Sequence, residues 1–95
     1  MALARVVAFD SLNPENLARI KEGVERGEVP EGMPPAEFLF LRDEAANAGL
    51  VIVIVESEDD YNRADEIMGG VPADEAPGPR TSVTKYRVAM RASAP

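Results

Sequence analysis

The chain has 95 residues, a formal net charge of −7 at pH 7 and an apolar content of 45%. This length predicts one small domain over residues 1–95, and the apolar content is typical of a globular rather than a disordered chain. The acidic balance argues against nucleic-acid and anionic-membrane partners. Cys and His are both absent, which excludes disulfides, thiolate nucleophiles and the commonest metal ligands.

No apolar run approaches the roughly 20 residues that a membrane-spanning helix needs. Residues 1–5 also lack the basic-then-apolar layout of a signal peptide. We therefore expect a cytoplasmic protein that has no membrane partner and uses no metal and no cofactor.

Residues 4–9 are apolar apart from Arg5 and read as a first strand. A helix follows, with Asn13 as its N-cap and Pro14 at the first helical position, where a missing N–H costs nothing. Its apolar positions recur at i, i+3 and i+7 and predict one packed stripe of Leu17, Ile20 and Val24. Gly27 is placed to end this helix.

The middle of the chain predicts a loop and two more strands. Residues 28–36 hold three prolines and form the loop, and residues 37–42 form the second strand. Residues 50–56 form the third strand, whose first six residues are Leu-Val-Ile-Val-Ile-Val. Val and Ile fit a pleated sheet better than a helix. Because strand side chains alternate between faces, this strand is apolar on both.

A second helix begins after Ser57, which can cap it, and three acidic residues follow at its positive end. Its apolar positions again have helical spacing, at Tyr61, Ala64 and Met68. Residues 71–80 form a Pro- and Gly-rich loop, and residues 81–92 form the last strand.

The predicted order is therefore β-α-β-β-α-β. Right-handed crossovers place both helices on one face of a four-stranded antiparallel sheet, with the first and third strands in the centre. This is an α+β fold of the ferredoxin-like type.

Two helices can cover only one face of this sheet, yet its strands are apolar on both. Leaving that second face bare would forgo several kcal/mol, at roughly 1.5–3 kcal/mol for each buried aliphatic side chain, and would invite association. Two copies packed about a twofold axis cover the face with itself, so we expect a homodimer. The alternative is a monomer whose long loops fold over the sheet.

Two segments carry a family resemblance. Residues 49–60, Gly-Leu-Val-Ile-Val-Ile-Val-Glu-Ser-Glu-Asp-Asp, and residues 81–88, Thr-Ser-Val-Thr-Lys-Tyr-Arg-Val, enclose a Pro-rich loop. This arrangement resembles the dimeric α/β-barrel superfamily, which includes antibiotic-biosynthesis-monooxygenase-like proteins and many small bacterial members. The resemblance implies a homodimer whose two sheets pack into a barrel, with a small-molecule pocket in each subunit.

The chain departs from the enzymes of that superfamily. Members that degrade haem use a His ligand, and quinone-forming members rely on a set that includes Trp; both residue types are absent here. No catalytic residue can therefore be carried over by position, and the catalytic residues stay unknown.

Candidate ligand-binding residues come from the residue types that remain. Tyr61 and Tyr86 could hydrogen-bond an oxygenated ligand or relay a proton, although helical spacing explains Tyr61 by packing alone. Met33 could close over a cavity, or simply fill a gap.

Arg5, Lys85 and Arg87 fall on neighbouring strands and could hold an anionic ligand. Their alternative role is to keep edge strands from associating wrongly or to form salt bridges. From the whole sequence we expect a homodimer that binds a small apolar or aromatic metabolite, in the manner of a cofactor-independent monooxygenase. The alternative is a non-catalytic regulatory or structural dimerisation module.

Overall fold

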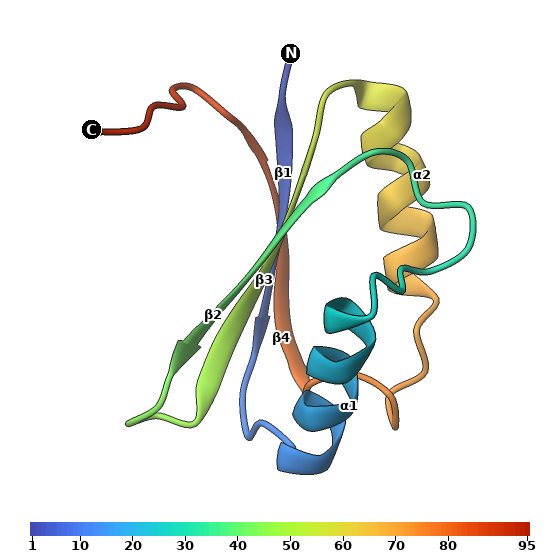
Figure 1. Cartoon of the computed structure of the whole chain (residues 1–95), viewed down its shortest axis with the longest axis vertical. Helices are drawn as coiled ribbons and strands as arrows, with labels where there is room; N and C mark the ends of the chain where they lie inside the picture. Colours follow the sequence, from blue (N-terminus) through green and yellow to red (C-terminus); the bar gives the residue numbers. More distant parts are fainter.

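The computed structural model describes residues 1–95 and has the predicted order of elements. Its strands and helices are β1 (Leu3–Phe9), α1 (Pro14–Glu25), β2 (Glu37–Asp43), β3 (Ala48–Val55), α2 (Glu58–Gly69) and β4 (Arg80–Arg87). The strands form one antiparallel sheet in the order β2-β3-β1-β4. The ferredoxin-like arrangement with β1 and β3 in the centre is thus confirmed (Figure 1).

Both helix starts are formed as predicted. The side chain of Asn13 accepts hydrogen bonds from the backbone N–H groups of Glu15 and Asn16, and Pro14 is the first helical residue. Ser57 Oγ accepts one from the N–H of Asp60. These bonds satisfy amide groups that have no partner inside the helix, so local sequence fixes where each helix begins.

The last strand is shorter than predicted. β4 ends at Arg87 and not at residue 92. Arg87 lies opposite Leu3, where β1 begins, and one further bond joins the N–H of Val88 to the carbonyl of Ala2. Beyond that point no strand of the sheet lies alongside, so the backbone has no ladder to continue. Residues 88–95 instead leave the sheet and point away from the helices (Figure 1).

The helix-covered face of the sheet carries the core. α2 packs on β1 and β3, and together they bury a cluster of Leu3, Val53, Val55, Tyr61 and Ala64. A second buried cluster of Val7, Phe9 and Leu12 lies further along β1, and the partly buried Val51 contacts both clusters. The core is therefore built from one side-chain parity of the two central strands.

Helix α1 contributes less to the core than its sequence predicts. Leu17 packs against the second cluster, but Ile20 is 37% exposed and Val24 is 62% exposed. The predicted apolar stripe is therefore wrong for these two residues. The physical reason is that the inward side of α1 carries Asn16, which is buried and hydrogen-bonded to the loop before β4. That loop holds α1 away from the sheet.

The opposite side of the sheet, which we call the open face, carries neither helix, and only the C-terminal segment reaches its end, where Arg91 pairs with Glu37 and Glu56. Both long loops lie on the helix side (Figure 1), so the loops do not roof it in the way the monomer alternative requires. The register places fourteen residues of the four strands on the open face. Two of them are the acidic Glu37 and Asp43, and the other twelve are Ala4, Val6, Ala8, Leu39, Leu41, Ala48, Leu50, Ile52, Ile54, Ser82, Thr84 and Tyr86.

Gly49 on β3 offers a test of how closely the edge strand β2 packs. A Cβ atom at this position would lie 2.7 Å from Phe40 Cε1 and 2.9 Å from the carbonyl oxygen of Leu41. We expect Gly49→Ala to lower the free energy of unfolding by about 1–3 kcal/mol, because a closely packed site must be forced apart. Urea denaturation measures this change.

The matched control is Gly23→Ala in α1, where the nearest atom to the added Cβ is 3.9 Å away. This variant should raise the free energy of unfolding by about 0.5–1 kcal/mol, because Ala is the better helix former. Equal effects of the two substitutions would contradict the packing at Gly49.

Candidate functional site

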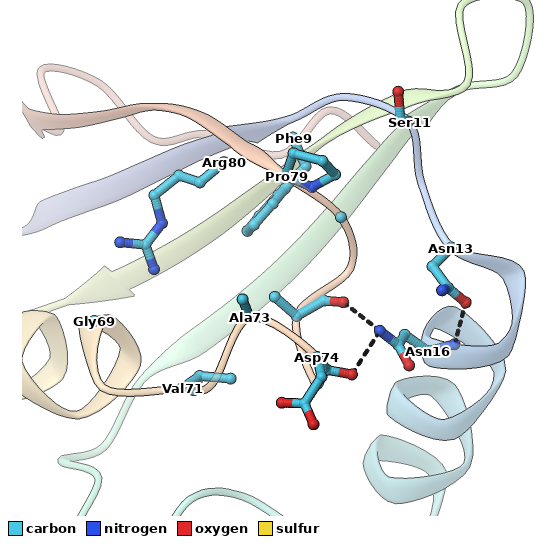
Figure 2. A pocket seen from close by; sticks show the side chains of 12 residues that line it. Phe9, Ser11, Asn13, Asn16, Gly69, Val71, Ala73, Asp74, Pro79 and Arg80 are labelled. Atoms are coloured by element: carbon cyan, nitrogen blue, oxygen red, sulfur yellow. Dashed lines mark hydrogen bonds between the residues drawn. The ribbon is translucent and has the colours of Figure 1, made fainter.

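The space between α1 and the sheet forms a cavity of about 640 Å³ that is partly open to solvent. Phe9 of β1 and Arg80 of β4 line it from the sheet, and Asn16 lines it from α1. Gly69 and Val71, at the end of α2 and just after it, close a further side (Figure 2). The cavity exists because α1 is held off the sheet, so the exposed apolar residues of α1 and the cavity have one cause.

At one end of the cavity the polar groups already have partners. The side-chain Nδ2 of Asn16 donates to the carbonyl oxygens of Asp74 and Ala76, at 2.9 and 2.8 Å. Its Oδ1 accepts a hydrogen bond from Arg19, and Asn13 is used as the helix cap. These side chains therefore fix the shape of the cavity and have little capacity left for a ligand (Figure 2).

At the other end lies a cation without a partner. The side chain of Arg80 makes no hydrogen bond or ion pair within the chain, and in Figure 2 its guanidinium group extends toward Gly69. A β-bulge determines its direction. Ser82 is opposite Ala8, but Arg80 is opposite Phe9, so the register shifts by one residue between them. Bulges commonly redirect a side chain in this way.

The bulge also explains why the sequence does not reveal Arg80 as a site residue. Strict alternation along β4 would put Arg80 on the open face with Ser82, Thr84 and Tyr86. The shifted register places it on the helix-covered face instead, beside the cavity. Asn is usually found on a solvated helix face, and the partners of Asn16 lie about 60 residues away in the sequence, so no local pattern identifies this residue either.

Arg5 and Tyr61, two of the predicted ligand-binding residues, lie close together beneath α2. The buried Arg5 donates from Nε to Asp65 Oδ1 at 2.8 Å. Opposite Arg5 on β4, Lys85 lies over the ring of Tyr61, with its Nζ 4.7 Å from the ring centroid, and also pairs with Glu58. Because cations favour the face of an aromatic ring, these contacts tie α2 to both β1 and β4.

The other candidates are dispersed. Tyr86 lies on the open face and is 54% exposed. Arg87 is exposed on the helix-covered side, opposite Leu3. Met33 is half-buried and packs against the cluster under α2. The structure thus brings Arg5 close to Tyr61 and Met33 close to the same core, while Tyr86 lies on the other side of the sheet. None of the six predicted residues lines the cavity, but a terminal amino group of Arg5 lies next to Gly69, which does.

Burial and the carboxylate of Asp65 together raise the pKa of Tyr61 above its ordinary value of 10.0. Burial disfavours the phenolate because it removes the charge from water, and the nearby negative charge adds to this effect. Tyr61 is therefore a neutral phenol at physiological pH and is held in the core, where it has no route to a substrate in the cavity.

Comparison with known proteins adds no family to this description. No protein-family model matches the chain, and no curated protein matches it. None of its helices combines the length and the apolar character needed to cross a membrane, and nowhere do three acidic side chains gather in a way that could hold a metal ion.

Asn16→Asp tests whether this side chain holds the cavity loop in place. The substitution replaces a donor by a carboxylate that faces two carbonyl oxygens, so we expect a loss of about 2–3 kcal/mol in the free energy of unfolding. Chemical denaturation measures it. Asn62→Asp is the matched control, since Asn62 is exposed on α2; a loss of similar size there would contradict the role of Asn16.

Tyr61 predicts a pH dependence at the alkaline end. An unfolded Tyr titrates near pH 10.0 and the folded one titrates higher, so the unfolded chain releases this proton first. The stabilisation is complete below pH 10 and is lost as the pH rises through 10 toward the folded pKa. Tyr61→Phe should therefore flatten the alkaline decline in stability. Tyr86→Phe, at an exposed position, should leave this decline unchanged. Unfolding measured across the alkaline range gives the comparison.

Proposed function

We propose that the protein is a homodimer of the dimeric α/β-barrel type that binds a small molecule in each subunit. The observation that carries the dimer is the open face. Its exposed apolar residues include Leu39, Leu41 and Leu50, which are 42%, 48% and 36% exposed. Monomeric proteins rarely expose a contiguous apolar patch of this kind, and such patches usually mark an interface.

The energetics favour association through this face. Six aliphatic side chains of each subunit lie on it: Val6, Leu39, Leu41, Leu50, Ile52 and Ile54. Completing the burial of these side chains in two copies contributes roughly 1 kcal/mol apiece. The total of about 12 kcal/mol exceeds the lower end of the association cost of about 4–15 kcal/mol by roughly 8 kcal/mol, which corresponds to a Kd near 1 μM.

The distribution of charged side chains over the surface favours a second copy as the partner at the open face. The chain carries 17 acidic and 10 basic residues, so two copies repel one another over most of their surface. The strands place only two charged side chains on the open face, Glu37 and Asp43, at the two ends of the edge strand β2, and Arg91 from the C-terminal segment pairs with Glu37. Two copies can therefore meet along an uncharged apolar surface that is complementary to itself about a twofold axis.

The cavity supports the small-molecule part of the proposal. It lies on the helix side of the sheet, so a dimer formed through the open face leaves both cavities accessible. Its lining mixes apolar residues, among them Phe9, Val71 and Pro79, with the polar side chains of Asn16, Asp74 and Arg80, and a ligand site needs both apolar contact and a few placed polar groups. We propose binding of an apolar or aromatic metabolite rather than its turnover, because both tyrosines lie outside the cavity.

The monooxygenase-like activity that the resemblance implies stays a prediction, and so does the alternative of a non-catalytic regulatory or structural dimerisation module. The open face supports both equally. They differ at the cavity: a structural module binds nothing there, a binding protein holds a ligand unchanged, and an oxygenase consumes oxygen when its substrate is added.

Ile52→Asp tests the dimer. Ile52 lies between Val6 and Leu39 at the centre of the open face. In a face-to-face dimer the substitution buries a carboxylate in each copy, so we expect Kd for the dimer to rise by more than about 100-fold, or roughly 3 kcal/mol. Light scattering at micromolar concentration should show twice the chain mass of 10.2 kDa for the wild type and a monomer for the variant.

Val83→Asp is the matched control, because Val83 belongs to the same sheet and is 43% exposed, but on the helix-covered side. It should remain a dimer. A wild type that scatters as a single chain of 10.2 kDa would refute the proposal, as would an Ile52→Asp variant that stays dimeric.

A further inference from the structure

We propose that the cavity binds a small organic carboxylate with an apolar body, and that Arg80 and Arg5 hold its acid group. This inference rests on the small-molecule part of the proposed function and specifies the ligand's chemistry. It starts from two guanidinium groups whose hydrogen-bonding capacity is largely unused.

Arg5 is the most buried charged side chain of the fold, at 3% exposure. A guanidinium group has five N–H donors, and only Nε of Arg5 is paired, with Asp65. No buried side-chain nitrogen of the chain is sealed from solvent without a partner, so the terminal amino groups of Arg5 keep contact with solvent. Their four N–H donors have no acceptor within the chain and are free to donate to a ligand in place of water.

Arg80 is unpaired although acidic residues outnumber basic ones by 17 to 10. Other basic residues of the chain do find carboxylates, as Arg26 does with Glu28. The β-bulge opposite Phe9 turns Arg80 toward the cavity. A local departure from regular pairing thus delivers a free cation to a hollow that is otherwise lined by uncharged groups and one acid, Asp74.

Gly69 links the two arginines. A Cβ atom on Gly69 would lie 4.0 Å from a terminal amino nitrogen of Arg5, and Gly69 itself lines the cavity. The guanidinium of Arg80 extends toward the same residue (Figure 2). The absence of a side chain on Gly69 leaves room beside Arg5 at the end of the cavity where Arg80 is found.

The surroundings indicate the kind of anion. Asp65 already offsets one of the two positive charges, so the pair has a net charge that matches a monoanion better than a dianion. The planar guanidinium fork fits a carboxylate. The Asp74 carbonyl is bonded to Asn16, at the end of the cavity away from Arg80 (Figure 2). Phe9 and Val71 lie between these ends and offer apolar contact to the body of the ligand.

The test is a titration of the full-length protein with benzoate, followed by amide chemical shifts in two-dimensional NMR. Benzamide, a neutral molecule of nearly the same shape, is titrated in parallel. Benzoate should shift the amide signals of Phe9, Gly69 and Arg80 at millimolar concentration. Benzamide should bind at least about tenfold more weakly, because it lacks the charge that strengthens the hydrogen bonds.

Arg80→Gln should weaken benzoate binding by about tenfold or more, and Arg5→Lys should also weaken it, since Lys keeps the charge but loses the fork. Arg80 is exposed, so its replacement should not disturb the fold. Arg42→Gln is the matched control: Arg42 is another exposed arginine without an ion pair, on the edge strand β2. It should bind benzoate as the wild type does.

The possible results of these titrations distinguish a failure of the carboxylate site from a failure of the proposed small-molecule function. Equal binding of benzoate and benzamide at the cavity would overturn the anion site and leave a small-molecule site standing. An equal loss in Arg80→Gln and Arg42→Gln would also overturn it, because total charge would then account for the binding. If neither molecule shifts any signal of the cavity, both the carboxylate site and the small-molecule function fail.

Discussion

The structure depends on a mismatch between the sheet and the helices available to cover it. The central strands β1 and β3 carry apolar residues on both faces, and both helices cross to the same side. One side-chain parity therefore forms the core, with Val7, Val53 and Val55 almost fully buried. The other parity has nothing to pack against within the chain. Because the hydrophobic effect penalises that exposure in proportion to area, topology and composition together support the proposed association.

A second mismatch produces the cavity. An amphipathic helix normally buries its whole apolar stripe, yet α1 leaves Ile20 and Val24 exposed. The two bonds from Asn16 to the loop before β4 compensate for part of this loss, since buried amide groups are costly unless paired. A packed helix would have filled the space above Phe9. The chain instead keeps a hollow there, at a cost in core packing that a purely structural module has no reason to bear.

Periodicity and capping residues predict most of the fold because they act locally. The β-branched run of β3, the Asn13 cap and the Ser57 cap need only their neighbours to be read correctly. The features that the sequence does not predict depend on partners that are distant along the chain. The end of β4 is set by where β1 begins, the inward side of α1 by carbonyl groups of residues 74 and 76, and the direction of Arg80 by a one-residue register shift. None of these leaves a local pattern, so Arg80 and Asn16 were missed as site residues.

The sheet keeps the two proposed surfaces apart. Neighbouring residues of β3, such as Ile52 and Val53, point to opposite faces, so the dimer surface and the core below the cavity can change independently. The exception is the bulge in β4, where one added residue moves Arg80 from the face of the dimer to the face of the cavity. On a regular strand this guanidinium would lie in the apolar interface and oppose association. The same irregularity that supplies the cavity with a cation therefore also keeps a charge out of the surface through which we propose that two acidic chains associate.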